Sequence, residues 1–246
     1  MESLWKESFE IKSFDVDFQQ NLKPSSLMQF FQEVASLHAQ SLGGGYEALI
    51  KRELFWALSR LKVEIARMPH WGETILIETW PCGNEGLFFR RDYMVYDKDQ
   101  KVIIRGVSGW LLVSVPTLRP QRPSQLGIEL PENKGKKSLD YFPQRITTQT
   151  TQVAFCKTVA YNEIDQNLHV NNTRYLDWAT DCFQLKHYQE FRLSVFSLEF
   201  LSETHWGDEI ELRMDGLGLK SDIEAFEKST GTTLFKAILN WQSSDL

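Results

Sequence analysis

The feature that most constrains the fold of this chain is an internal repeat. His70-Trp71-Gly72-Glu73 is followed by the alternating segment TILIE, and His205-Trp206-Gly207-Asp208 is followed by the similar segment EIELR. Upstream, the tripeptide Gln-Asn-Leu occurs at 20–22 and at 166–168, each time before a helical pattern. Because two copies are too few for a stacked repeat array, the sequence predicts two similar units fused in one chain.

The two copies differ in length. The Gln-Asn-Leu tripeptides lie 146 residues apart and the His-Trp-Gly tripeptides 135, so the first copy has 11 additional residues between its two marks. We expect the insertion to include Gly43-Gly44-Gly45 and the residues beside it.

Each copy begins with a predicted helix. In the first, Ser26 and Gln29 fit a capping box, and the glycine run at 43–45 ends the helix. In the second, Asn171 or Asn172 is a suitable N-cap. The apolar faces at helical spacing are Leu27, Phe30, Phe31, Val34, Ala35 and Leu42 in the first copy, and Tyr175, Leu176, Ala179, Cys182 and Phe183 in the second.

Strand patterns follow each helix. They cover residues 55–65, 74–80, 87–96 and 102–115 in the first copy, and 194–203, 209–214, 221–228 and 232–241 in the second. A long helix followed by an antiparallel meander predicts an α+β fold in which a curved sheet wraps the helix. We expect the two units to share a continuous sheet.

A proline-rich stretch separates the copies. Five of the eight prolines lie between residues 116 and 143, and proline removes a backbone donor from regular ladders. We therefore predict an N-terminal unit at 1–130, a linker at 131–149 and a C-terminal unit at 150–246.

Composition excludes several classes of protein. A hydrophobic content of 42% argues against disorder, and a net charge of -6 argues against a nucleic-acid footprint. We expect no membrane span, because no apolar run is long enough, and no secretory signal. The three cysteines are scattered and form no metal-binding pattern, so we predict no metal, no cofactor and a cytoplasmic location.

The densest polar motif is Asp165-x-Asn167-x-His169, directly before the second helix. Alternate side chains of an extended segment point to the same side, and the helix amino end can stabilise an oxyanion. This combination suits hydrolysis of an activated ester or thioester. The alternative is that these residues only shape a turn and cap the helix.

Comparison of the copies favours the catalytic interpretation. Aligned on Gln-Asn-Leu, His169 corresponds to Lys23 and Asp165 to Gln19, so only the second copy carries the ionisable set. The other candidates are weaker. His70 and His205 occupy matching turns and are interpreted as structural. His38 is interpreted as an interior or pocket-wall residue and Cys182 as a packing residue, while Cys82 lies near a strand end without an obvious base.

The segment DQNLHVNNTRYLDW, residues 165–178, resembles the signature D-x-N-x-H-V-N-N-x-x-Y of the acyl-acyl carrier protein thioesterases. The resemblance extends to LFWALSRLKVEIARMPHWGETILIETW, RRDYMVYD, GVSGWLLVS and LEFLSETHWGDEIEL. Only the 131–149 linker lacks a clear counterpart.

The resemblance implies a double hot-dog fold and hydrolysis of the thioester that joins a fatty acyl chain to acyl carrier protein (ACP). It carries catalytic roles onto Asp165, Asn167, His169 and Glu203. The next position, typically cysteine in the family, is Thr204, which argues against a cysteine nucleophile. We expect Thr204 to help Glu203 activate the hydrolytic water, and we expect no cofactor.

An acyl chain needs an apolar pocket, and ACP is acidic. The candidate pocket residues are Phe30, Phe31, Phe55, Trp56, Phe88 and Phe89, and the candidate carrier-docking cations are Arg90, Arg91, Lys134, Lys136 and Lys137. Two alternatives stay open, an acyl-CoA thioesterase of hot-dog type and a non-catalytic acyl-binding module. A homodimer is compatible with the sequence, which leaves the oligomeric state open.

Overall fold

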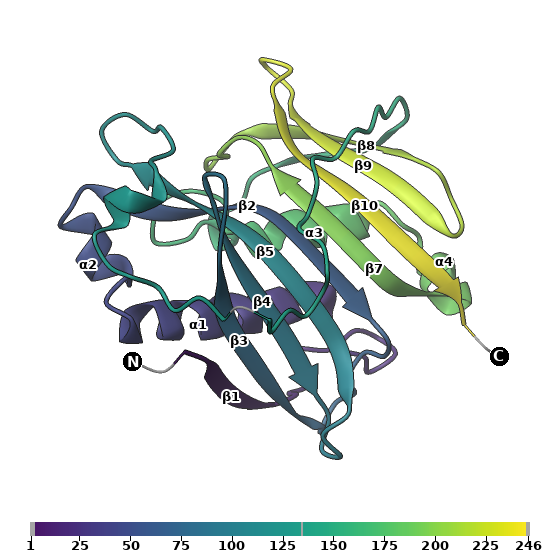
Figure 1. The fold of residues 1–246 in the computed structure, drawn as a ribbon. Coiled ribbons are helices and arrows are strands. Elements are labelled where there is room, and N and C mark those ends of the chain that lie inside the picture. The colour runs from purple at the N-terminus through teal and green to yellow at the C-terminus, as the bar shows by residue number, and fades with distance from the viewer. Residues whose placement is uncertain (1–2, 134, 245–246) are drawn as a thin grey trace. The chain divides into compact units, whose positions relative to one another are not determined.

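The computed structural model describes residues 3–133 and 135–244. The chain divides into two compact units, Met1–Pro143 and Gln144–Leu246, called unit 1 and unit 2 below. Among the described residues, each unit combines one main helix with five antiparallel strands, which confirms the predicted α+β class (Figure 1). Within the described ranges, no helix has both the length and the apolar character that crossing a membrane requires.

Unit 1 places its main helix against one face of its sheet. Its elements are β1 (Trp5–Glu10), α1 (Pro24–Ser41), α2 (Tyr46–Ile50), β2 (Leu54–Ile65), β3 (Thr74–Glu85), β4 (Phe88–Tyr96), β5 (Val102–Ser114) and the 3-10 turn η1 (Pro123–Leu126). The strand order is β1-β3-β4-β5-β2. Phe31 of α1 stacks on Tyr93 of β4, with ring centroids 4.3 Å apart, and so fixes the helix on the sheet.

Unit 2 repeats this arrangement. Its elements are β6 (Val153–Thr158), η2 (Tyr161–Glu163), α3 (Asn172–Asp181), α4 (Leu185–Glu190), β7 (Phe191–Phe200), β8 (Glu209–Asp215), β9 (Lys220–Glu227) and β10 (Thr233–Ser243). The strand order β6-β8-β9-β10-β7 equals that of unit 1 when elements are matched in chain order. Each unit is therefore a hot-dog fold, a helix wrapped by an antiparallel sheet, and the predicted duplication is confirmed.

The loop before each main helix shows how the repeats align. Asp17 N donates to Asn21 O and Gln20 N to Asp17 O, while Asp165 N donates to His169 O and Leu168 N to Asp165 O. Gln20 and Leu168 both adopt a φ of 64°. Asp165 therefore corresponds to Asp17 and His169 to Asn21. The alignment on Gln-Asn-Leu is two residues out of register, and the predicted pairing with Gln19 and Lys23 is wrong.

The two main helices begin differently. Asn171 caps α3 by accepting a hydrogen bond from Thr173 N, as predicted. Helix α1 instead begins at Pro24, a residue that suits the first helical position. Its N-cap residue, Lys23, makes no capping hydrogen bond with its side chain. The capping box predicted at Ser26 and Gln29 is wrong, since both residues lie inside the helix. Helix α1 also has 18 residues against 10 in α3, so much of the insertion lies in the helix itself.

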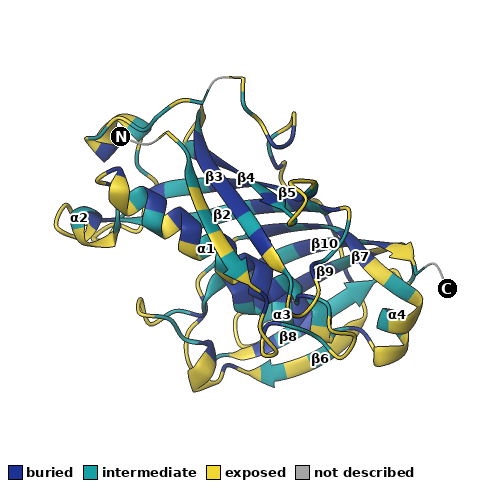
Figure 2. Cartoon of the chain, turned by 90° about the horizontal axis from the view of Figure 1, so that it is seen from below, coloured by how far each residue is buried: buried dark blue, intermediate teal, exposed yellow. Residues whose placement is uncertain are grey.

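Strand β4 is buried on both faces (Figure 2), because the stretch that follows β5 returns across the sheet (Figure 1). On the face opposite α1, Arg90 pairs with Asp92 at 2.7 Å, and Asp92 Oδ2 accepts hydrogen bonds from Ser138 N and Ser138 Oγ. Phe142 packs so closely on β5 that a side chain at Gly109 would lie 2.5 Å from its ring. Ser138 and Leu139 are therefore buried in the core of unit 1, and Phe142 packs at its edge.

We expect Asp92→Asn to destabilise unit 1 by about 3 kcal/mol or more, because Arg90 would keep a buried charge without a counter-charge. The free energy of unfolding is measured by urea titration. The control is Glu190→Gln, which breaks the exposed Lys186–Glu190 pair and should change stability by less than about 0.5 kcal/mol. Equal effects of the two substitutions would contradict a structural role for the Arg90–Asp92 pair.

Candidate active site

The loop at 164–170 of unit 2 presents the predicted polar motif. A bridge between Ile164 and Val170 closes the loop, and Asp165 Oδ1 accepts a hydrogen bond from Asn167 N at 2.8 Å. These contacts hold a tight turn in which Asn167 is exposed and His169 is partly exposed. The loop therefore directs its polar side chains to the surface just before α3.

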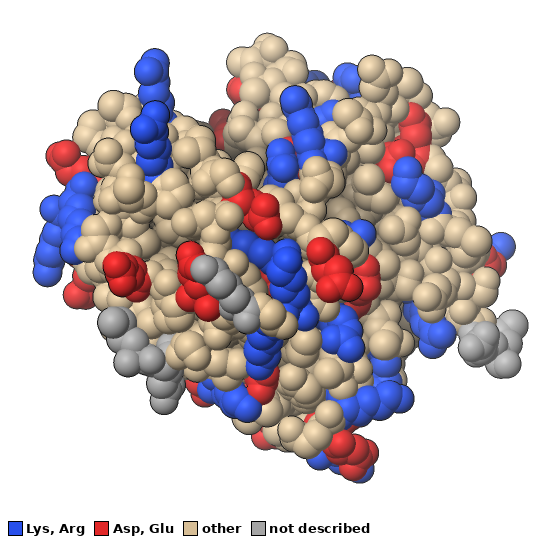
Figure 3. Space-filling model, in the orientation of Figure 1, with Lys and Arg blue, Asp and Glu red and all other residues tan. Residues whose placement is uncertain are grey.

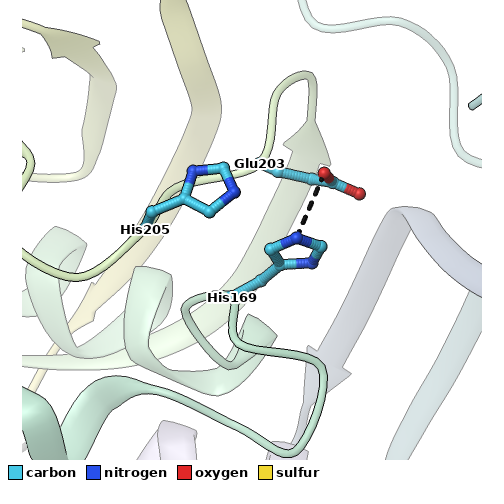
Figure 4. Close-up of side chains that lie close together, drawn as sticks. All are labelled: His169, Glu203 and His205. Carbon is cyan, nitrogen blue, oxygen red and sulfur yellow. Dashed lines mark ion pairs between the residues drawn. The ribbon is translucent and has the colours of Figure 1, made fainter.

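A backbone hydrogen bond joins this loop to the segment after β7. Val170 N donates to Thr204 O at 2.8 Å, which brings the residues on either side of it together. His169 Nε2 lies 3.4 Å from Glu203 Oε2, and both side chains are partly exposed (Figure 4). The structure thus brings together two of the predicted catalytic residues that are distant in sequence.

His205 belongs to the same group, although sequence reasoning gave it only a structural role. Its ring meets that of His169 edge-on, with centroids 4.9 Å apart (Figure 4). His205 N also donates to Asp208 Oδ2 at 2.8 Å, so the residue shapes its turn as well. The alternation of an extended segment, which puts positions 203 and 205 on one side, is the signal that could have identified it.

Thr204 lies beneath this group and has no exposed surface. Its hydroxyl accepts a hydrogen bond from Tyr175 Oη at 2.9 Å. Burial, together with the nearby charges of Glu203 and Asp165, raises the pKa of Tyr175 to about 12, so this phenol stays protonated. The side chain of Thr204 therefore faces the interior, and the expectation that it helps Glu203 activate the hydrolytic water stays a prediction.

The amino end of α3 is less available than expected. Asn171 Oδ1 accepts from Thr173 N at 3.0 Å, and Arg174 N donates to Asn171 O at 2.9 Å. Amides that are engaged in capping the helix cannot also hold an oxyanion. The exposed side-chain amide of Asn167 is the better donor for that role.

The matching positions of unit 1 show which residues distinguish unit 2. Counted from the shared His-Trp-Gly tripeptide, Glu203 corresponds to Met68 and Thr204 to Pro69, while Asn21 takes the place of His169. Asp165 has its counterpart in Asp17, whose Oδ1 accepts from Gln19 N at 2.9 Å in the same kind of turn. The His–Glu pair is thus particular to unit 2, whereas the aspartate is shared.

The aromatic residues predicted to line the acyl pocket make several separate packing contacts in unit 1. Trp56 and Phe89 meet edge-on at 4.8 Å within an apolar cluster that includes Leu49, Leu54, Leu112 and Leu126. Phe31 stacks on Tyr93, Phe30 on Phe9 at 4.5 Å, and Phe88 packs on Phe142, while Phe55 is half-buried. The structure therefore brings Trp56 and Phe89 together and leaves the acyl-chain role of the six residues a prediction.

The predicted carrier-docking cations are mostly not surface groups. Arg90 and Arg91 are 2% and 8% exposed; Arg90 is paired with Asp92, and Arg91 Nη1 lies 3.1 Å from His38 Nδ1. Their assignment to a docking surface is wrong, because a carrier cannot reach them. Lys136 is half-exposed and pairs with Glu78 at 2.9 Å.

The remaining cations leave the docking surface unassigned. Lys137 is exposed, and Lys134 lies outside the described residues. On the face drawn in Figure 3, lysines and arginines are interspersed with carboxylates.

The sequence of this chain matches a known protein family. Residues 2–125 match the family model of the acyl-ACP thioesterase N-terminal domain, and residues 147–243 match that of the C-terminal domain. The chain therefore belongs to the acyl-ACP thioesterase family, as its sequence motifs suggest.

Individual relatives support this placement. The chain is 27% identical to a palmitoyl-acyl carrier protein thioesterase of Gossypium hirsutum, over 81% of this chain and 52% of the relative. It is 28% identical to a dodecanoyl-ACP hydrolase of Cinnamomum camphora, over 81% and 56%. It spans about half the length of these relatives. An acyl-ACP thioesterase of Bacteroides thetaiotaomicron matches with a TM-score of 0.90 and 27% identity, over 98% of each chain.

The structure makes two of the three cysteines poor nucleophiles. Burial raises the pKa of Cys82 and of Cys182 to about 12, and only the thiolate is a good nucleophile. The Sγ atoms of Cys82 and Cys182 contact the carbonyls of Lys136 and Trp178, so both thiols serve packing, as predicted for Cys182.

We predict that iodoacetamide at pH 8 modifies the folded protein at Cys156, the exposed thiol, much faster than at Cys82 or Cys182. Mass spectrometry should find about one modified thiol before unfolding and all three after it. Rapid modification of Cys82 or Cys182 in the folded protein would contradict this assignment.

Proposed function

We propose that this protein hydrolyses the thioester of fatty acyl-ACP and releases a free fatty acid, which ends elongation in fatty acid biosynthesis. The observation that carries the proposal is the His169–Glu203 pair, found in unit 2 of a chain that belongs to the acyl-ACP thioesterase family. An imidazole and a carboxylate within reach of one another form a general base for water. The matching positions of unit 1, Asn21 and Met68, lack that chemistry.

The proposed roles follow from the chemistry of each side chain. Glu203 and His169 activate the hydrolytic water, and the amide of Asn167 donates to the carbonyl oxygen as it becomes an oxyanion. Asp165 has one carboxylate oxygen held by Asn167 N, which leaves the other for the reaction. That oxygen either attacks the thioester carbon, which expels the carrier thiol and forms an anhydride that water then hydrolyses, or draws a proton from the water that attacks the thioester. After a single turnover in heavy-oxygen water, label in Asp165 identifies the covalent route.

A thiol-release assay separates this proposal from its two alternatives. An acyl-CoA thioesterase would use similar groups, and an acyl-binding module would need none of them. We expect thiol release from dodecanoyl- or palmitoyl-ACP with kcat/KM at least about tenfold above that for the matching acyl-CoA. A higher value for acyl-CoA would favour the first alternative, and binding of acyl-ACP without thiol release would favour the second.

The role of Asp165 can be tested without disturbing its turn. Asparagine keeps an oxygen that can accept the Asn167 N–H, so Asp165→Asn removes the charge and preserves the loop. We expect kcat for acyl-ACP hydrolysis to fall at least about 100-fold.

The matched control is Asp17→Asn, the same change in the same kind of turn of unit 1. It should leave kcat within about twofold of the unchanged protein. Full activity of Asp165→Asn would mean that Asp165, like Asp17, only shapes a turn.

The relatives are named for palmitoyl and dodecanoyl groups, so they do not fix one acyl chain length for this protein. We also propose a cellular compartment. The three cysteines are all free, which supports a reducing compartment such as the cytoplasm.

A further inference from the structure

We propose that His169, Glu203 and His205 form a zinc-binding site, and that bound zinc inhibits hydrolysis at the candidate active site. Two imidazoles and one carboxylate are a ligand set that proteins use for zinc while leaving a fourth position open. The three side chains converge on one region from two segments of unit 2 (Figure 4). The inhibitory consequence rests on the proposed function, whereas zinc binding itself is measured without substrate.

The distances suit a small cation. Zinc bonds of about 2.1 Å in a tetrahedral site place neighbouring ligand atoms about 3.4 Å apart. His169 Nε2 and Glu203 Oε2 are already 3.4 Å apart, and the ligand atoms of all three residues lie within 4.8 Å of one another. A small rotation of the exposed His205 side chain closes the remaining gap.

A carboxylate lies near the other ring nitrogen of the third ligand. His205 Nδ1 lies 3.8 Å from Asp208 Oδ2, which leaves Nε2 as the nitrogen that faces a metal. In metal sites a carboxylate commonly accepts a hydrogen bond from the opposite nitrogen of a histidine ligand. A small movement of Asp208 would make that bond to His205.

Zinc at this position would stop the proposed chemistry directly. The lone pair of His169 and the carboxylate of Glu203 would be bound to the metal, and neither could then accept a proton from water. The matching positions of unit 1 carry Asn21, Met68 and His70, of which only the histidine is a good zinc ligand. Unit 1 thus supplies the same turn without the site.

The binding experiment is a zinc titration of the full chain against a chromophoric chelator, after metal removal with EDTA and desalting. We expect about one zinc per chain in the unchanged protein and at least about tenfold weaker binding for His205→Ala. The matched control, His70→Ala, changes the same exposed turn position of unit 1 and should bind zinc within about twofold of the unchanged protein.

His205→Asn is tested in parallel, with circular dichroism as the check on folding, so that a misfolded variant is not mistaken for a lost ligand. Cobalt supplies a second readout, because a tetrahedral cobalt site absorbs visible light. Zinc binding by His205→Ala and His205→Asn as tight as that of the unchanged protein would overturn the site.

The activity experiment measures acyl-ACP hydrolysis against free zinc, each variant relative to its own metal-free rate. We expect inhibition of the unchanged protein and of His70→Ala at the same zinc concentration, and at least about tenfold more zinc for half-inhibition of His205→Ala. Unchanged or increased hydrolysis at saturating zinc would overturn the inhibitory role. If the metal-free protein releases no thiol, the proposed function fails, and the titration still decides the metal site.

Discussion

The hydrogen bond from Val170 N to Thr204 O is the contact on which the candidate active site depends. It joins the loop before α3 to the segment after β7, and His169 and Glu203 are the residues that directly precede its two partners. Unit 1 has the same bond, from Leu22 N to Pro69 O. The hot-dog unit therefore builds this junction wherever it occurs, and the side chains beside it decide whether the junction can do chemistry.

The duplication separates structural from chemical requirements. Asp17 and Asp165 both accept a backbone hydrogen bond in a tight turn, so a side-chain oxygen at this position serves the turn in each copy. The fold does not require histidine at 169 or glutamate at 203, since Asn21 and Met68 occupy the matching positions of unit 1. Residues that differ between two copies of one scaffold are the better candidates for function, and His205 joins them through its contact with His169.

Much of the fold could be predicted because its signals are local. Alternating and continuous apolar runs identified eight of the strands close to their observed bounds, and Asn171 marked the start of α3. The edge strands β1 and β6 and the short helices α2 and α4 were missed. β1 and β6 alternate half-buried and exposed residues and carry charged side chains, so their apolar signal is weak.

The errors about the site have a common physical origin in contacts between distant residues. Arg90 and Arg91 are predicted to be exposed because charged side chains usually are, whereas Asp92 and the returning 138–142 segment bury Arg90. The shared Gln-Asn-Leu tripeptide suggests a repeat register that the backbone hydrogen bonds shift by two residues. His205 shares a tripeptide with His70, and only its packing against His169 sets it apart.

The most direct test of the account gives unit 2 the residues of unit 1 at the two positions that distinguish it. The double variant His169→Asn with Glu203→Met keeps side chains that the same junction already accommodates in unit 1. We predict that it folds with unchanged stability and still binds acyl-ACP, while single-turnover hydrolysis falls at least about 1,000-fold. Hydrolysis at the original rate by this variant would contradict the claim that the His169–Glu203 pair is what makes unit 2 catalytic.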